Sequence, residues 1–293
     1  MCFLQKICVF FIGSTVFVWI IQEKTLSLHP LTHVEFEYMR NLPIVTRSIL
    51  WANVLVFLLD AVLQRYGVSL SAICGLHYFS AQQFFFWQPF TYMFLHADFG
   101  HIFFNMFAVL MFAPVLEREW GPRRFLVYYL VCGIGAGLMQ EAVWAMMYQP
   151  TLSAMTAQQA AYYINPLITI GASGAVFGIL FAFGWLFPNV PLFIMFVPIP
   201  IRARVFVIIY AVIELLAGLG SVVGAGDHVA HFAHLGGMLF GWLLLLWWRH
   251  GEDNWSYKIR RGWRDFTNRF RKHPRLDSTA DKDYSDYHYQ KRV

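Results

Sequence analysis

Two residues whose side chains are able to act in catalysis lie inside strongly apolar stretches of this chain. Ser173 stands in the sequence Gly-Ala-Ser-Gly, which begins at Gly171, and His234 follows much later in Ala-His-Leu-Gly-Gly. Polar side chains within apolar segments of membrane-spanning length are costly to keep in lipid and mark functional sites. A serine becomes a nucleophile when an adjacent base takes its proton, and a neutral imidazole can do so. We therefore interpret Ser173 and His234 as a nucleophile and its base, provided that their two segments pack together.

The sequence around Ser173 also has a packing interpretation. Gly174 and Gly178 are four residues apart, which gives a helix a smooth face against which another helix can close. A helix that begins near Ser173 would direct free N–H groups and its positive dipole end toward the hydroxyl. The nucleophile elbow Gly-x-Ser-x-Gly is excluded, because Ala175 occupies the place of its last glycine. Taken alone, this sequence fits catalysis or helix packing.

His234 is the last of three histidines spaced three residues apart, after His228 and His231. Gly237 and Gly241 follow at an interval of four, so this segment has a smooth face of its own. Two such faces would allow the close approach that a serine–histidine hydrogen bond requires. A histidine series is also typical of a metal site or of a polar cap at the membrane surface, and both alternatives stay open here.

A third polar group precedes these two and comprises His96, His101 and Asn105. His101 and Asn105 are four residues apart and share one helix face. Acyl transfer requires donors that stabilise the oxyanion of the tetrahedral intermediate. These two side chains, together with the main-chain N–H of Ser173, could supply them. The alternative is a buried polar network that only holds helices together.

The elements that position these residues are membrane-spanning helices. The chain is 58% hydrophobic and 13% charged, with a mean hydropathy of +0.50, which is typical of membrane proteins. About 20 apolar residues span a bilayer as a helix. By this criterion six spans are expected, of which the first and fifth are short: Ile49–Leu63, His101–Leu116, Phe125–Met147, Leu167–Phe187, Val205–Leu219 and Val229–Trp248.

Basic residues orient these spans, because loops rich in Lys and Arg stay in the cytoplasm. Arginines precede the first span and also lie between the second and third spans and between the fourth and fifth, and many basic residues follow the sixth. The opposite loops carry only Arg65. Both ends of the helical core are therefore expected in the cytoplasm. The net charge of +5 comes from this asymmetry and from the tail, so nucleic acid is not expected as a partner.

The regions outside the core have different compositions. Residues 1–38 contain the apolar run Ile7–Ile21. It fits an extra N-terminal helix, a signal anchor or an artefact of a start codon assigned too far upstream. Residues 39–248 form the six-helix core. Residues 249–275 predict a basic, amphipathic cytoplasmic helix that binds lipid, and residues 276–293 predict a disordered tail. The four cysteines have neither metal-site spacing nor a disulfide pattern.

With its motifs assembled in order, the chain resembles the rhomboid family of intramembrane serine proteases over about Met39–Trp248. The resemblance rests on four pieces: Trp87-Gln88, His96-x4-His101-x3-Asn105, Gly171-x-Ser173-Gly174-x3-Gly178 and His234-x2-Gly237-x3-Gly241. It implies an all-α membrane protein with a six-helix bundle, a Ser173–His234 dyad without an acidic third member, and an oxyanion hole with His101 and Asn105. It gives His96 a structural role and makes the loop Gln64–Gln88 a membrane-dipping segment. Because this chain keeps both dyad residues, activity is expected.

The resemblance also implies the substrate, which is a peptide bond in or beside a transmembrane segment of another membrane protein. It implies neither a metal nor an organic cofactor, and a bacterial inner membrane is the expected location. Two rival functions stay open, a histidine-based transporter or metal-handling protein and a non-catalytic rhomboid-like binder of membrane clients. Glu214 is the lone acid inside the fifth span, where it could pair with a bundle histidine or form a hydrogen bond while protonated.

Overall fold

The computed structural model describes residues 5–12, 15–22, 42–194, 200–222 and 230–251. Five of its helices are long and apolar enough to cross a membrane, and one further apolar helix is shorter. In chain order these six are α2 (Ile44–Gln64), α5 (Phe99–Trp120), α6 (Pro122–Leu152), α8 (Ser173–Leu186), α9 (Ala203–Val222) and α10 (His231–Gly251). The expected all-α membrane bundle is therefore confirmed.

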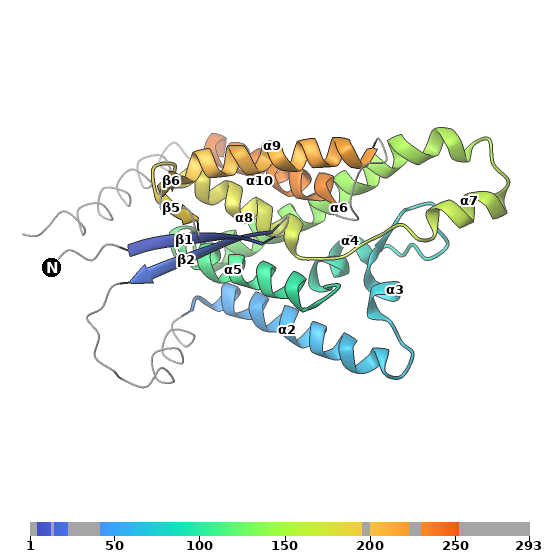
Figure 1. Ribbon diagram of the computed structural model, residues 1–293, viewed down its shortest axis with the longest axis horizontal. Coiled ribbons are helices and arrows are strands. Elements are labelled where there is room, and N and C mark those ends of the chain that lie inside the picture. The colour runs from blue at the N-terminus through green and yellow to red at the C-terminus, as the bar shows by residue number, and fades with distance from the viewer. Residues whose placement is uncertain (1–4, 13–14, 23–41, 195–199, 223–229, 252–293) are drawn as a thin grey trace, which may run out of the picture.

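The short helix α8 lies at the centre of the bundle. It packs against α5, α6, α9 and α10, while α2 contacts the outer side of α5 (Figure 1). Most of its residues are buried. Its 14 residues rise about 21 Å, which is less than the roughly 30 Å of a hydrocarbon core. If Leu186 lies near one membrane surface, Ser173 must therefore lie below the other.

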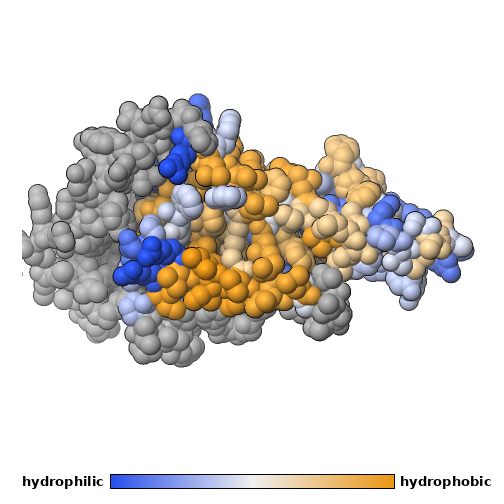
Figure 2. Space-filling model, turned by 90° about the horizontal axis from the view of Figure 1, so that it is seen from above, coloured by the Kyte–Doolittle hydropathy of each residue, from blue (hydrophilic) through white to orange (hydrophobic). Residues whose placement is uncertain are grey.

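The outward faces of the helices are apolar. Figure 2 shows a mainly hydrophobic band across the middle of one face, with hydrophilic residues toward its two ends. On α9, large exposed apolar side chains recur along the helix, among them Ile208, Val212 and Leu216. A helix that is apolar on its exposed side is typical of a membrane span. Lipid is thus the expected environment of this band.

Two helix ends are joined by a buried carboxylate. The first turn of α2 follows Pro43, whose side chain makes no capping hydrogen bond. Glu117 of α5 replaces the cap, because its carboxylate accepts from the main-chain N–H of Val45 at 2.9 Å and of Thr46 at 2.7 Å. It also accepts from the Thr46 hydroxyl at 2.7 Å. Free N–H groups and the positive dipole end of a helix favour a negative charge at this place.

Short elements connect the long helices. Between α2 and α5 the chain forms α3 (Leu70–Cys74), β3 (Leu76–His77), α4 (Gln88–Thr91) and the 3₁₀ turn η1 (Tyr92–Phe94). Between α6 and α8 it forms α7 (Ala157–Ile164) and β4 (Ile168–Thr169). The antiparallel pair β3–β4 ties the first loop to the segment that leads into α8.

A small sheet lies at one end of the molecule (Figure 1). The strands β1 (Gln5–Ile12) and β2 (Thr15–Gln22) are antiparallel, and β1 also pairs with β5 (Pro191–Ile194), which pairs with β6 (Pro200–Arg202). Of the alternatives for Ile7–Ile21, the helical one is thus wrong. This run is rich in β-branched and aromatic residues, and a two-residue Gly-Ser connection separates its halves, a combination that favours a hairpin. The amphipathic helix and tail predicted beyond Gly251 lie outside the described residues.

Candidate active site

Ser173 and His234 meet in the structure. Ser173 is the first residue of α8, and His234 lies one turn into α10. The hydroxyl Oγ of Ser173 is 2.8 Å from Nε2 of His234. The histidine is buried and the serine is half-buried. This is the distance at which an imidazole can take a hydroxyl proton.

Glycines permit the close approach of α8 and α10. A Cβ on Gly237 would collide with the carbonyl oxygen of Gly174, so the two backbones touch at this point. A Cβ on Gly178 would collide with Cys132 of α6 and lie 3.1 Å from the carbonyl oxygen of Gly237. The expected packing of the two glycine faces is confirmed at these positions. Gly241 differs, because it faces the Tyr128 hydroxyl of α6.

An acidic side chain joins the pair from a third helix. Oε2 of Glu214, on α9, is 2.8 Å from Nδ1 of His234 and 2.7 Å from Nδ1 of His231. All three side chains are buried. A carboxylate only accepts hydrogen bonds, so it favours the tautomer of His234 with its proton on Nδ1 and a free lone pair on Nε2. Of the alternatives for Glu214, pairing with a bundle histidine is the one observed, so an acid lies beside His234 although the resemblance implies a dyad without an acidic third member. His228 lies outside the described residues.

The imidazole of His234 is also held by an aromatic ring. Phe177 lies one turn after Ser173 on α8, and its ring stacks on the imidazole with centroids 4.2 Å apart and planes 8° apart. Tyr210 of α9 stacks in turn on Phe177, with ring centroids 5.2 Å apart. This stack limits rotation of the His234 ring and leaves both of its nitrogens with the partners described above.

His101 lies near Ser173 because of an unusual backbone conformation at Gly171. Gly171 has φ = +130°, a conformation that residues with a Cβ rarely adopt. A Cβ built there would lie 2.7 Å from Nε2 of His101 and 3.5 Å from Oγ of Ser173, so both atoms border the same space. Nδ1 of His101 accepts a hydrogen bond from the main-chain N–H of Ala97 at 3.4 Å. That arrangement leaves the proton on Nε2, the nitrogen that borders the space beside Gly171.

Asn105 and His96 are placed differently from His101. The Asn105 side chain is buried and donates to the carbonyl oxygen of His101 at 3.1 Å. This hydrogen bond stays within α5 and does not reach Ser173. His96 is buried, with its ring edge-on to that of His101 at a centroid distance of 4.9 Å. His96 is therefore placed to position the His101 ring.

The first loop is organised by Gln88, which is fully buried. Its amide donates to the carbonyl oxygens of Gln83 at 2.7 Å and Ile73 at 3.2 Å, and its own oxygen accepts from the N–H of His77 at 3.2 Å. These bonds use both the amide N–H groups and the carbonyl oxygen of the glutamine side chain. Large aromatic side chains nearby are exposed, Phe86 most of all at 85%.

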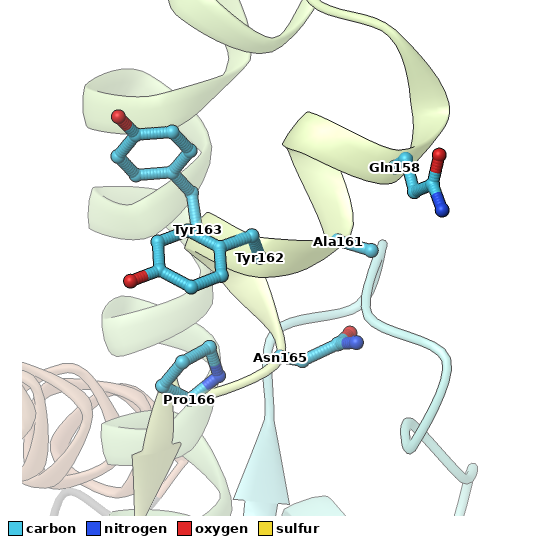
Figure 3. A pocket seen from close by; sticks show the side chains of 6 residues that line it. All are labelled: Gln158, Ala161, Tyr162, Tyr163, Asn165 and Pro166. Carbon is cyan, nitrogen blue, oxygen red and sulfur yellow. The ribbon is translucent and has the colours of Figure 1, made fainter.

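A shallow, open pocket of about 560 Å³ lies on and after α7, away from these residues. Figure 3 shows the side chains that line it, which are Gln158, Ala161, Tyr162, Tyr163, Asn165 and Pro166. None of them belongs to the polar groups that the sequence singled out. The pocket is therefore separate from the candidate site.

Sequence reasoning did not give a role to two of the side chains around His234. Phe177 is apolar within an apolar span, so only its spacing of four residues from Ser173 could have drawn attention to it. Glu214 did stand out as the lone acid of its span. Its partner could not be chosen, because several histidines belong to the same bundle.

The chain matches a family model described as the Rhomboid domain over residues 83–250, which is more than half of its length. It is 30% identical over 158 residues to RHOMBOID-like protein 1 of Arabidopsis thaliana, covering 54% of this chain and 33% of that protein. It is 31% identical over 164 residues to Rhomboid protease AarA of Providencia stuartii, covering 54% of each.

A further similarity is to Rhomboid protein 1, mitochondrial, of Saccharomyces cerevisiae, which is 29% identical over 152 residues. This match covers 52% of this chain and 40% of the yeast protein. The matched part of the chain thus spans between about a third and about a half of these three relatives.

Proposed function

The chain belongs to the rhomboid family, and from this membership we propose that it is an intramembrane serine endopeptidase with Ser173 as nucleophile and His234 as general base. Its five helices of membrane-spanning length make it an integral membrane protein. The substrate class is peptide bonds within or next to transmembrane segments of other membrane proteins. The single observation that carries the proposal is the 2.8 Å contact between the Ser173 hydroxyl and Nε2 of His234.

The first step is attack on a peptide carbonyl. Nε2 of His234 takes the proton of Ser173 while the serine oxygen forms a bond to the carbonyl carbon. Glu214 acts as a positioning residue, because its carboxylate accepts from Nδ1 of His234 and stabilises the positive charge that the imidazole gains. In this respect the proposal departs from a two-residue dyad.

The oxyanion of the tetrahedral intermediate requires hydrogen-bond donors. Nε2–H of His101 supports this role, since it borders the same space as the Ser173 hydroxyl. The main-chain N–H groups at the start of α8 are further donors, and the positive dipole end of the helix favours negative charge there. Asn105 contributes through His101, whose carbonyl oxygen it binds.

The cycle ends with proton return and deacylation. His234 donates its proton to the leaving amine, the peptide C–N bond breaks, and an acyl-enzyme remains on Ser173. His234 then takes a proton from water, which attacks the ester carbonyl, and returns this proton to the Ser173 oxygen as the acyl bond breaks and the second product is released. A substrate helix must unwind locally first, because a helical carbonyl is engaged in its own hydrogen bond. Residues that disfavour helix, such as Gly and Pro, should therefore promote cleavage nearby.

The distribution of basic residues supports an orientation with both ends of the core in the cytoplasm. Ser173 then faces the outer side of the membrane. A bacterial inner membrane is the proposed location of the protein. This assignment is testable with cysteine-accessibility labelling of Arg124→Cys and Ser153→Cys in intact cells. In a background with the four native cysteines changed to serine, the first should be protected and the second labelled by a membrane-impermeant reagent.

Cleavage of a defined reporter tests the proposed activity. The protein is purified in detergent and incubated with a membrane protein that carries one transmembrane segment. Wild type should cut it, and Ser173→Ala and His234→Ala should lose the cut. Cleavage that survives in Ser173→Ala would eliminate Ser173 as nucleophile, and absence of cleavage in wild type across a set of substrates would favour a non-catalytic binder.

A further inference from the structure

Three potential metal ligands converge beside the serine. We propose that Glu214, His231 and His234 together bind a divalent metal ion of the zinc type, and that the bound ion blocks the Ser173–His234 pair. The metal-binding part stands on these three side chains alone. The inhibitory part rests on the proposed function.

The geometry brings the ligand atoms from two helices to one point. His231 and His234 are three residues apart and share a face of α10, while Glu214 comes from α9. One ligand atom from each lies within 4.8 Å of the others, and both Nδ1 atoms are within 2.8 Å of the same carboxylate oxygen. Gly218 of α9 lies beside His231, and a Cβ there would come within 3.3 Å of the His231 Cβ, a tight contact.

The chemistry of the three ligands favours zinc. Two imidazole nitrogens and one carboxylate form a set that holds Zn²⁺ with a fourth position open, at ligand distances of about 2.0–2.2 Å. The atoms already converge, so small side-chain shifts would bring them to these distances. Burial of all three side chains excludes competing water, and the negative carboxylate offsets part of the positive charge of the ion.

His231 is the residue that makes a metal site a better explanation than positioning alone. One carboxylate and one imidazole suffice to orient His234, and the proposed mechanism has no role for a second histidine. Yet Nδ1 of His231 is as close to Oε2 of Glu214 as Nδ1 of His234 is. A second nitrogen at the same oxygen completes a three-ligand site.

Metal binding at Nδ1 would switch off the nucleophile. Catalysis needs the His234 tautomer with its proton on Nδ1, so that Nε2 can accept the proton of Ser173. A metal ion takes the Nδ1 lone pair, which moves the proton of the neutral imidazole to Nε2. The nitrogen that faces Ser173 is then already protonated. It can no longer act as a base, so zinc and catalysis exclude each other.

The binding test uses the Ser173→Ala variant, which keeps all three ligands and needs no activity. The purified, chelator-treated protein is titrated with Co²⁺, which reports its coordination by visible absorption, and Zn²⁺ is then added as competitor. We expect one Co²⁺ per chain in a site that Zn²⁺ empties. Adding His231→Gln should weaken Co²⁺ binding by more than about 10–100-fold, because a loss of that size is typical of a residue that only hydrogen-bonds a metal ligand.

His77→Gln in the same background is the matched control. His77 is also buried, but its ring bonds the carbonyl oxygen of Ala72 in the first loop. Its loss should leave the Co²⁺ titration as it was. Equal binding by the His231→Gln and parent proteins would overturn the proposed site, as would the absence of any ion that Zn²⁺ displaces.

Inhibition is measured separately on the active protein with the reporter substrate. Zn²⁺ should abolish cleavage and a chelator should restore it. In His231→Gln the half-inhibitory Zn²⁺ concentration should rise at least 10-fold when each variant is compared with its own metal-free rate. Stoichiometric binding without inhibition would overturn the inhibitory part. If wild type cleaves no substrate, the proposed function fails, while the Co²⁺ titration still decides the metal site.

Discussion

Two glutamates, each on a membrane-spanning helix, show how the same buried side chain can serve structure or chemistry. Glu117 and Glu214 are each 3% exposed, and each accepts hydrogen bonds from more than one group. The donors of Glu117 are two main-chain N–H groups and a threonine hydroxyl. The donors of Glu214 are two imidazoles, one of which also contacts Ser173.

The difference lies in what the donors can do next. Amide and hydroxyl donors keep their protons, so the Glu117 group only fixes α2 to α5. An imidazole can give up or gain a proton and has a second nitrogen on its far side. In the proposed mechanism, the Glu214 group therefore affects the reactivity of Ser173 through its charge. A buried carboxylate is a sign of chemistry when its donors can titrate and is otherwise a sign of architecture.

The largest difference between the two glutamates is expected in kcat when each is changed to glutamine. Glu214→Gln should lower kcat by about 10²–10⁴-fold with little change in KM, because the amide can donate to Nδ1 and favour the wrong tautomer of His234. Glu214→Asp, which restores a carboxylate, should recover part of the rate. Steady-state kinetics on the reporter substrate measure both. A change in KM alone would reduce Glu214 to the structural role of Glu117.

Within the site, His101 and Asn105 should differ in the same way as the two glutamates. His101→Ala should lower kcat by about 10²–10³-fold, the usual loss for one oxyanion donor. Asn105→Ala should cost less, because the amide donates to the main-chain oxygen of His101. The comparison uses kcat for both variants at saturating reporter. A larger loss in Asn105→Ala would reverse the assignment.

The smallest effect on turnover is expected for Glu117→Gln. This change weakens the cap of α2 and should lower the free energy of unfolding by about 1–3 kcal/mol, the range for a damaged buried hydrogen-bond group. Thermal unfolding in detergent would report the loss. The kcat per folded molecule should stay that of wild type. A fall in kcat without a fall in stability would break the contrast between the glutamates.

The sequence was sufficient to predict the contact between Ser173 and His234, because the glycine spacing that brings their helices together can be read along each helix separately. Glycines four residues apart mark the helix faces that touch, as the contact of Gly174 with Gly237 confirms. The start of α8 at Ser173 was likewise expected from its sequence. The partner of Glu214 depends instead on how α9 is rotated against α10, which no spacing along one helix determines. The difference between His101 and Asn105 depends on the backbone of Gly171, which is a tertiary feature.

The N-terminal run shows the limit of hydrophobicity as a signal. Ile7–Ile21 is apolar enough for a helix, but the strands β1 and β2 form over it. The residue types and the Gly-Ser connection favour strands over a helix here, whereas the length of the apolar run does not separate the two. The expected spans Ile49–Leu63 and Val205–Leu219 are no longer than Ile7–Ile21, yet both lie within helices of membrane-spanning length.

The most direct measurement of the central claim is covalent labelling with a fluorophosphonate, followed by peptide mapping. A serine reacts with this reagent only when an adjacent base activates it. We predict one adduct per chain, located on Ser173 in wild type and lost in His234→Ala. An adduct on another residue, or equal labelling of Ser173 without His234, would contradict the account.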